Sequence, residues 1–127
     1  MKARYAFALV AMAGLGLGFT GVKQLHAQSK GPAFLVIDYN ESNDSAEYKA
    51  ALDKATGLVN SGGGHFIIRG TNAMALDGTA PKRFVVIQFD SVEKAKAWND
   101  DPAVKDFNAI REKLTKSRSF IVESAPN

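Results

Sequence analysis

Residues 65–89 read HFIIRGTNAMALDGTAPKRFVVIQF, with an apolar run at each end and a more polar segment between them. Both runs, 65–69 and 83–89, are rich in β-branched and aromatic residues, a composition that is typical of strands. The segment 77–81 contains Asp, Gly and Pro, which favour a turn. We therefore predict two neighbouring strands joined by a hairpin-like connection.

A helix is predicted on each side of this pair. Asp44 starts the first helix, and Glu47 three residues later completes a capping box. The apolar residues that follow have the spacing of one helix face: Tyr48, Ala51, Leu52, Ala55, Leu58 and Val59. A run of three glycines ends this helix. Asp90 caps the second helix with Glu93 three residues on, and Pro102 restarts it at a first helical position.

Two outer strands complete the pattern. The apolar runs at 33–39 and 119–123 lie at the two ends of the sequence just described. The order of elements is therefore β-α-β-β-α-β. This is the α+β, ferredoxin-like arrangement, in which both helices cover one face of a four-stranded antiparallel sheet.

The predicted strands are apolar on both faces. Runs such as FLVI at 34–37 and FVVI at 84–87 do not alternate with polar residues, as strands with one wet face do. Two helices cover only one face, and the other face would expose a larger apolar patch than monomers normally show. We therefore expect a homodimer in which two sheets pack face to face as a dimeric α/β barrel.

The first 27 residues have the composition of an export signal. Lys2 and Arg4 precede an uncharged run at 5–22, and Ala27 is a small residue at a plausible cleavage point. We predict a cleaved signal peptide at 1–27, followed by one domain at 28–127. The protein is then periplasmic or secreted, without stable membrane association. An uncleaved membrane anchor is the alternative.

The formal net charge of +3 belongs to this leader. Lys2, Arg4 and Lys23 lie in it without an acidic residue, so 13 of the 16 basic residues remain to match 13 acidic ones. A balanced domain without a basic stripe argues against nucleic acid as a partner. The chain has no cysteine and only two histidines, which argues against a thiol enzyme or a zinc site held by the protein alone. No metal or cofactor is predicted.

Two segments resemble the motifs of a known family. The stretch GGHFIIRG at 63–70 looks like a GG-x-aromatic-x-x-R-G motif, and PKRFVVIQFDS at 81–91 looks like P-x-R-x-V-V-x-x-F-x-S. Trp98, Asp101 and Arg111 follow at the expected distances. The chain thus resembles the small bacterial family called domain of unknown function 1330, of the dimeric α/β-barrel superfamily. The resemblance implies the ferredoxin-like fold and the homodimer, but no settled reaction.

The first strand of the opening stretch carries two candidate site residues. Strict alternation would place His65 and Arg69 on one face and Phe66 on the other. With Phe66 under the helices, His65 and Arg69 would point between the two sheets. Arg69 would then bind a carboxylate, and His65 would be a catalytic acid or base near neutral pH. In the alternative, Arg69 pairs with an acidic residue such as Asp38, and His65 is exposed.

Three further residues are candidates for ligand binding. Arg83 lies beside Pro81, and a salt bridge at the end of the hairpin is the alternative. Arg111 lies beside the apolar stripe of the last helix, where an arginine more often extends its stem along the core and its charge into water. Trp98 is either a platform for a ligand or part of the core.

These site residues favour a protein that binds or transforms a small organic molecule, with an anion among the ligands considered. Two other classes stay open. A haem-binding or haem-degrading protein would use His65 as an axial ligand, and a structural or stress-related dimer would have no catalytic role. The sequence contains no P-loop, serine-hydrolase or zinc-protease motif.

Overall fold

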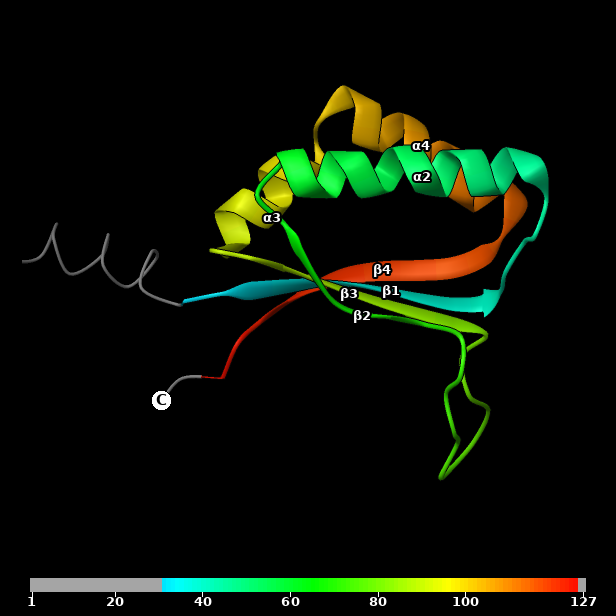
Figure 1. Cartoon of the computed structure of the whole chain (residues 1–127). Helices are drawn as coiled ribbons and strands as arrows, with labels where there is room; N and C mark the ends of the chain where they lie inside the picture. The colour runs from blue at the N-terminus through cyan, green and yellow to red at the C-terminus, as the bar shows by residue number, and fades with distance from the viewer. Residues whose placement is uncertain (1–30, 126–127) are drawn as a thin grey trace, which may run out of the picture. The chain divides into compact units, whose positions relative to one another are not determined.

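The computed structural model describes residues 31–125 (Figure 1). The predicted leader at 1–27 lies outside the described residues, so its cleavage stays a prediction. Within 31–125 the elements are β1 (Ala33–Glu41), α2 (Ala46–Ser61), β2 (His65–Gly70), β3 (Arg83–Phe89), α3 (Val92–Asn99), α4 (Pro102–Leu114) and β4 (Lys116–Glu123). In this part of the chain, none of the helices has the length and apolar character needed to cross a membrane.

The four strands form one antiparallel sheet in the order β2-β3-β1-β4. All three helices lie on the same side of it (Figure 1), which we call the helix-covered face; the opposite side is the open face. The predicted ferredoxin-like α+β fold is confirmed, including the strand pair at 65–89 and the break in the second helix. The last strand begins at Lys116, earlier than predicted.

The N-cap of α2 differs from the prediction. Ser45, and not Asp44, is the capping residue, and its hydroxyl accepts a hydrogen bond from the backbone N–H of Tyr48 at 3.2 Å. The side chain of Asn43 accepts from the N–H of Ser45 at 2.7 Å. This local turn fixes the backbone just before the helix, so the first helical residue comes one position later.

The second helix shows the same shift. Ser91, and not Asp90, caps α3 by accepting from the N–H of Lys94 at 3.1 Å. Asp90 instead forms an exposed ion pair with the side chain of Lys94 at 3.6 Å. In α4 the prediction is confirmed, because Asp101 accepts from Ala103 at 2.8 Å and Pro102 opens the helix.

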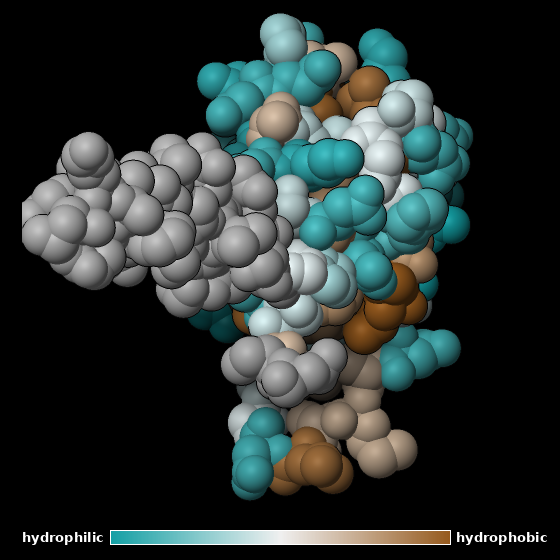
Figure 2. All heavy atoms as spheres, turned by 90° about the vertical axis from the view of Figure 1, so that its left-hand side faces the viewer, coloured by the Kyte–Doolittle hydropathy of each residue, from teal (hydrophilic) through white to brown (hydrophobic). Residues whose placement is uncertain are grey.

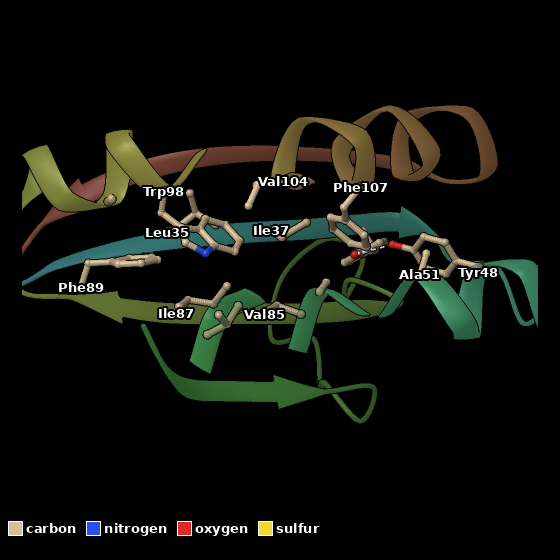
Figure 3. Close-up of a cluster of buried hydrophobic side chains, with 14 residues drawn as sticks. Leu35, Ile37, Tyr48, Ala51, Val85, Ile87, Phe89, Trp98, Val104 and Phe107 are labelled. Atoms are coloured by element: carbon tan, nitrogen blue, oxygen red, sulfur yellow. Dashed lines mark hydrogen bonds between the residues drawn. The ribbon is translucent and has the colours of Figure 1, made fainter. Parts of the chain in front are cut away.

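The core lies between the helix-covered face and the helices (Figure 3). Every second residue of β1 and β3 points into it, while Trp98 and Phe107 project from the helices. Its largest fully buried side chains are Tyr39, Tyr48, Phe89, Ile87, Val59 and Val104. Gly62 packs so closely on Trp98 that a Cβ atom there would overlap the indole ring, and Gly63 has a φ of +85°. The glycines therefore permit the close turn from α2 into β2.

The open face carries the alternate residues of the same strands and is also apolar. Ile68, Phe120 and Val122 are 46%, 42% and 45% exposed on it. The register places Phe34 and Val36 of β1 on the same face, opposite residues of β3 and β4. The prediction that the strands are apolar on both faces is confirmed for the described sheet.

The segment 71–82, which we call the arm, connects β2 to β3. It projects from the sheet on the side away from the helices (Figure 1). Met74 and Leu76 on the arm are 86% and 91% exposed, and hydrophobic atoms are visible near its tip at the bottom of Figure 2. The arm therefore presents large apolar side chains on the same side as the open face.

Candidate functional site

A β-bulge in β2 decides which way Arg69 points. Phe66 pairs with Ile87 of β3 and Arg69 pairs with Val85, and both of these partners face the core. Ile67 is an extra residue at the register shift between them. The insertion reverses the alternation, so Phe66 and Arg69 share the helix-covered face. The predicted position of Arg69 between two sheets is therefore wrong.

The bulge also separates Arg69 from His65. His65 is exposed and lies opposite Gln88, on the open face. The sheet stands between the two side chains, so they do not form one site within a single copy. The catalytic role of His65 and its role as a haem ligand stay predictions. Within residues 31–125, no group of three or more His, Cys, Asp or Glu side chains is placed to hold a metal ion.

A small apolar chamber lies between α2 and the sheet. Its volume open to the centres of water molecules is about 40 Å³. Four aromatic residues from four elements line it: Tyr39, Phe66, Trp98 and Phe107. Aliphatic side chains complete the wall: Ile37, Leu52, Ala55, Val59, Val85 and Ile87. Figure 3 shows Trp98 and Phe107 facing the sheet residues of this wall.

A wider, more polar cavity of about 480 Å³, which we call the mouth, lies beside the chamber. Leu52, Thr56, Arg69 and Arg83 line both cavities, so the chamber and the mouth are adjacent. Lys49 and Asp53 of α2 complete the rim. The site as a whole thus has an apolar interior and a largely cationic entrance, which suits a ligand with an apolar body and an anionic group.

Arg69 is held at the mouth by two weak contacts. Its Nη1 atom donates to the hydroxyl of Thr56 at 3.3 Å, and its guanidinium lies 4.3 Å from the centre of the Phe66 ring. Among the described residues it forms no ion pair. The salt bridge considered between Arg69 and Asp38 is not formed, because Asp38 pairs with Arg118 at 3.3 Å. Most donors of Arg69 are therefore available to a ligand.

Arg83, which lines the chamber and the mouth, carries an unsatisfied donor. Its Nε atom is buried and has no hydrogen-bond partner among residues 31–125. The salt bridge considered for the end of the hairpin is not formed within the described residues. A buried donor without an acceptor costs about 1–3 kcal/mol. The atom has almost no surface open to solvent, so a ligand acceptor that removes this cost reaches it only after a shift of the Arg83 side chain.

Two tyrosines extend the polar end of the site. Tyr39, which lines the chamber and lies opposite Arg83 in the sheet, shares a 2.6 Å hydrogen bond with the hydroxyl of Tyr48. Burial raises the pKa of Tyr39 above its usual value, although Tyr48, Arg111 and Arg83 each lower it. Burial, followed by the bond to Tyr39, raises the pKa of Tyr48 as well. Both hydroxyls are therefore protonated near neutral pH.

Arg111 lies beyond this tyrosine pair and does not line the chamber or the mouth. It is only 4% exposed. Its guanidinium donates to the hydroxyl of Ser117 and, at 3.3 Å, to the side chain of Asn108. Its charge is therefore enclosed by the protein. The alternative in which the guanidinium extends into water is wrong. Its role in ligand binding stays a prediction.

Trp98 combines the two positions considered for it, one in the core and one beside a possible ligand. It packs on Phe89 with the ring centres 5.5 Å apart, and it also lines the chamber. Its indole N–H already donates to the backbone carbonyl of Leu58 at 2.9 Å. Only its ring face and edge are left to contact a ligand.

Sequence reasoning missed Thr56, Tyr39 and the rim residues of α2. Tyr39 continues the period-two pattern of Leu35 and Ile37, which marks it as inward-facing. Thr56 lies next to Ala55, at the edge of the apolar stripe of α2. These two periodicities could have found both residues. The cavity between them depends on side-chain volumes, which no pattern states.

The sequence and the structure match known proteins. The family model of domain of unknown function 1330 matches residues 32–125. None of the curated proteins matches the sequence significantly. Among solved structures, a protein of unknown function from Rhodopseudomonas palustris is 17% identical, with a TM-score of 0.60 over 77% of this chain and 85% of that one.

Two other solved structures have the same fold. A dimeric ferredoxin-like protein of unknown function from Jannaschia sp. is 12% identical, with a TM-score of 0.61 over 74% of this chain and 100% of that one. SnoaB, a cofactor-independent oxygenase from Streptomyces nogalater, is 9% identical, with a TM-score of 0.55 over 76% and 96% of the two chains. At these identities the likeness shows the fold alone.

Proposed function

This chain belongs to the family of domain of unknown function 1330, and on that premise we propose that it binds a small organic anion in the pocket beneath α2, as one half of a homodimer. The observation that carries the binding proposal is the buried Nε atom of Arg83, which has no partner among the described residues. A shift of the Arg83 side chain that opens its Nε atom to the pocket would let a carboxylate accept two parallel hydrogen bonds, from Nε and from one Nη.

The charges around the pocket support an anion. Arg69, Arg83 and Lys49 line the mouth, and Asp53 is the single acidic residue of its rim. The interior is apolar, and charge-assisted hydrogen bonds are stronger beside such a low-dielectric wall than in water. An uncharged polar ligand would leave the arginine donors without a strong acceptor.

Trp98 offers a direct test, because it is the one tryptophan of the sequence and it lines the chamber. Titration of the purified protein with butyrate should change the fluorescence of Trp98 in a saturable way. Arg83→Gln should weaken binding by about 10- to 100-fold, because a hydrogen bond to a charged group contributes about 1.5–3 kcal/mol. Arg83→Lys, which keeps the charge but not the fork, should recover only part of the affinity.

The matched control is Lys105→Gln, which removes a positive charge from an exposed position on α4 outside the pocket. It should leave the affinity unchanged. Equal losses in Lys105→Gln and Arg83→Gln would mean that only the overall charge matters, and the proposed site would be wrong. Absence of any saturable response in the unmodified protein would also refute it.

The homodimer is proposed through the open face. Its support is the exposed apolar set of Ile68, Phe120 and Val122, together with the arm that carries Met74 and Leu76 on the same side. The described residues include no element that covers this face, and a second copy would bury it symmetrically. The fold neighbour from Jannaschia sp. is itself described as dimeric. Sedimentation velocity at micromolar concentration should show a dimer.

We also propose export to the periplasm or beyond, on the composition of residues 1–27. Expression of the full chain with a C-terminal tag tests this step. The tagged protein should appear in the periplasmic or secreted fraction with Gln28 at its N-terminus. Recovery of the intact chain from the membrane fraction would favour the uncleaved anchor, and recovery of the intact chain from the cytoplasm would contradict export.

A further inference from the structure

The dimensions of the chamber point to the size of the ligand's apolar part. We propose that the pocket selects short-chain aliphatic monocarboxylates, with a tail of about three carbon atoms beyond the carboxylate. This inference rests on the proposed anion site at Arg83 and adds a limit on what lies behind it.

The volume sets the limit. About 40 Å³ of the chamber is open to the centres of water molecules. The chamber is therefore small, and a tail of about three carbon atoms is the length that we propose for it. An apolar cavity on the order of 150 Å³ is known to bind benzene, so an aromatic ring exceeds the space that the chamber provides.

The hydrogen bonds of the wall set the chemistry of the tail. The indole N–H of Trp98 donates to the carbonyl of Leu58. The hydroxyl of Thr56 donates to the carbonyl of Leu52 at 3.0 Å, and the hydroxyl of Tyr39 is paired with that of Tyr48. A hydroxylated tail would therefore lose its hydrogen bonds to water and gain few in return. The wall favours a plain hydrocarbon tail.

The position of the arginines sets the orientation. Arg69 and Arg83 line both the chamber and the mouth, so a carboxylate held there directs its tail inward. Substituents next to the carboxylate would lie in the wider mouth of about 480 Å³, beside Lys49 and Asp53. The length limit therefore applies to the distal carbons, and polar groups near the acid are compatible with it.

A homologous series tests this proposal. Acetate, propionate, butyrate, pentanoate, hexanoate, octanoate and benzoate are titrated against the purified protein, with Trp98 fluorescence and isothermal calorimetry as independent readouts. Affinity should rise about fourfold with each added methylene up to butyrate, which corresponds to about 0.8 kcal/mol per buried methylene. It should stop rising at pentanoate and fall for hexanoate, octanoate and benzoate.

Two small substitutions should move this optimum in opposite directions. Ala55→Val adds bulk at the chamber wall and should shift the preference to acetate and propionate, whereas Ile87→Val removes one methyl group and should shift it to pentanoate. Ile110→Val is the matched control, because it deletes the same methyl group from a residue outside the chamber wall. It should leave the optimum at butyrate.

The outcomes separate the two proposals. If no acid of the series produces a saturable response, the anion site itself is refuted. If affinity keeps rising to octanoate, or if benzoate binds as well as butyrate, the length limit is overturned while the anion site stands. An optimum that moves equally in Ile87→Val and Ile110→Val would also overturn the chamber as its cause.

Discussion

The two faces of the sheet consist of the same apolar strands, but their surroundings differ. On the helix-covered face, Leu35 and Ile87 are 4% and 2% exposed beneath the helices. On the open face, Phe120 and Val122 of the same sheet are 42% and 45% exposed. The helices cover one face, whereas no element of the described residues covers the other.

The arginines show the reverse pattern, because the arginine with an ion-pair partner lies on the open face. On the open face, Arg118 has a carboxylate partner in Asp38 at 3.3 Å and lies 5.7 Å from the ring centre of Phe120. On the helix-covered face, Arg69 and Arg83 form no ion pair among the described residues. The two proposals rest on this contrast: an apolar partner surface is proposed for the open face, and an anion for the helix-covered face.

The largest effect is expected from truncating a core side chain beneath the helix-covered face. Phe107→Ala should lower the free energy of unfolding by about 3–5 kcal/mol, because the ring is 7% exposed and stacks on Tyr48 with 6.2 Å between ring centres. Phe120→Ala is the matched truncation on the open face and should cost about 0.5 kcal/mol in the monomer. Urea titration at low protein concentration measures both, and equal costs would contradict the division between the faces.

A charged side chain on the open face should disrupt the proposed dimer. Phe120→Asp should raise the dissociation constant of the dimer by at least about 100-fold, because two carboxylates would have to be desolvated in the interface. Sedimentation velocity over a concentration series measures this change. Lys105→Asp places the same group on the helical side and should leave the dimer intact. An unchanged dimer in Phe120→Asp would place the interface elsewhere.

A smaller effect on stability is expected from substitutions of the arginines on the two faces. Arg83→Met removes the unsatisfied donor, so the ligand-free protein should gain about 1 kcal/mol of stability. The same change should abolish the increase in melting temperature that butyrate causes. Arg118→Met removes a paired arginine from the open face and should give no such gain. Destabilisation by Arg83→Met would mean that the guanidinium of Arg83 is fully hydrogen-bonded without a ligand, and would contradict the proposed contrast.

The fold followed from the sequence because its signals are local. Periodicity located the four strands and both helical regions, and Asp101-Pro102 marked the restart of the second helix. The N-caps were placed one residue too early at Asp44 and Asp90, because an aspartate and a serine stand side by side in each case. Either residue type is a good cap, so composition did not distinguish them.

The site was less predictable than the fold, and Ile67 shows why. One extra residue in the apolar run at 65–69 reverses the face of Arg69, yet it leaves no trace in the sequence pattern. Arg83 was recognised by residue type, but its unsatisfied Nε atom depends on packing around it. The bond between Tyr39 and Tyr48 joins two elements whose approach only the tertiary structure fixes.

An effect of similar size is expected from that tyrosine pair, at the edge of the helix-covered face. Tyr48→Phe should cost about 1 kcal/mol at neutral pH through the lost hydrogen bond. Burial raises the pKa of both tyrosines above the usual 10.0, so above pH 10 the unfolded chain releases protons that the folded chain keeps. Stability should therefore fall as the pH rises above 10, and less steeply in Tyr48→Phe. Urea titrations between pH 9 and 11 measure the slopes, and identical slopes would contradict this assignment.

A crystal structure of the protein with bound butyrate tests the proposed anion site most directly. We expect a carboxylate on the Nε and one Nη of Arg83, within reach of Arg69, with the tail directed toward Trp98 and Phe107. A structure in which saturating butyrate leaves the chamber vacant, with the Nε of Arg83 bonded to an acceptor of the chain itself, would contradict it.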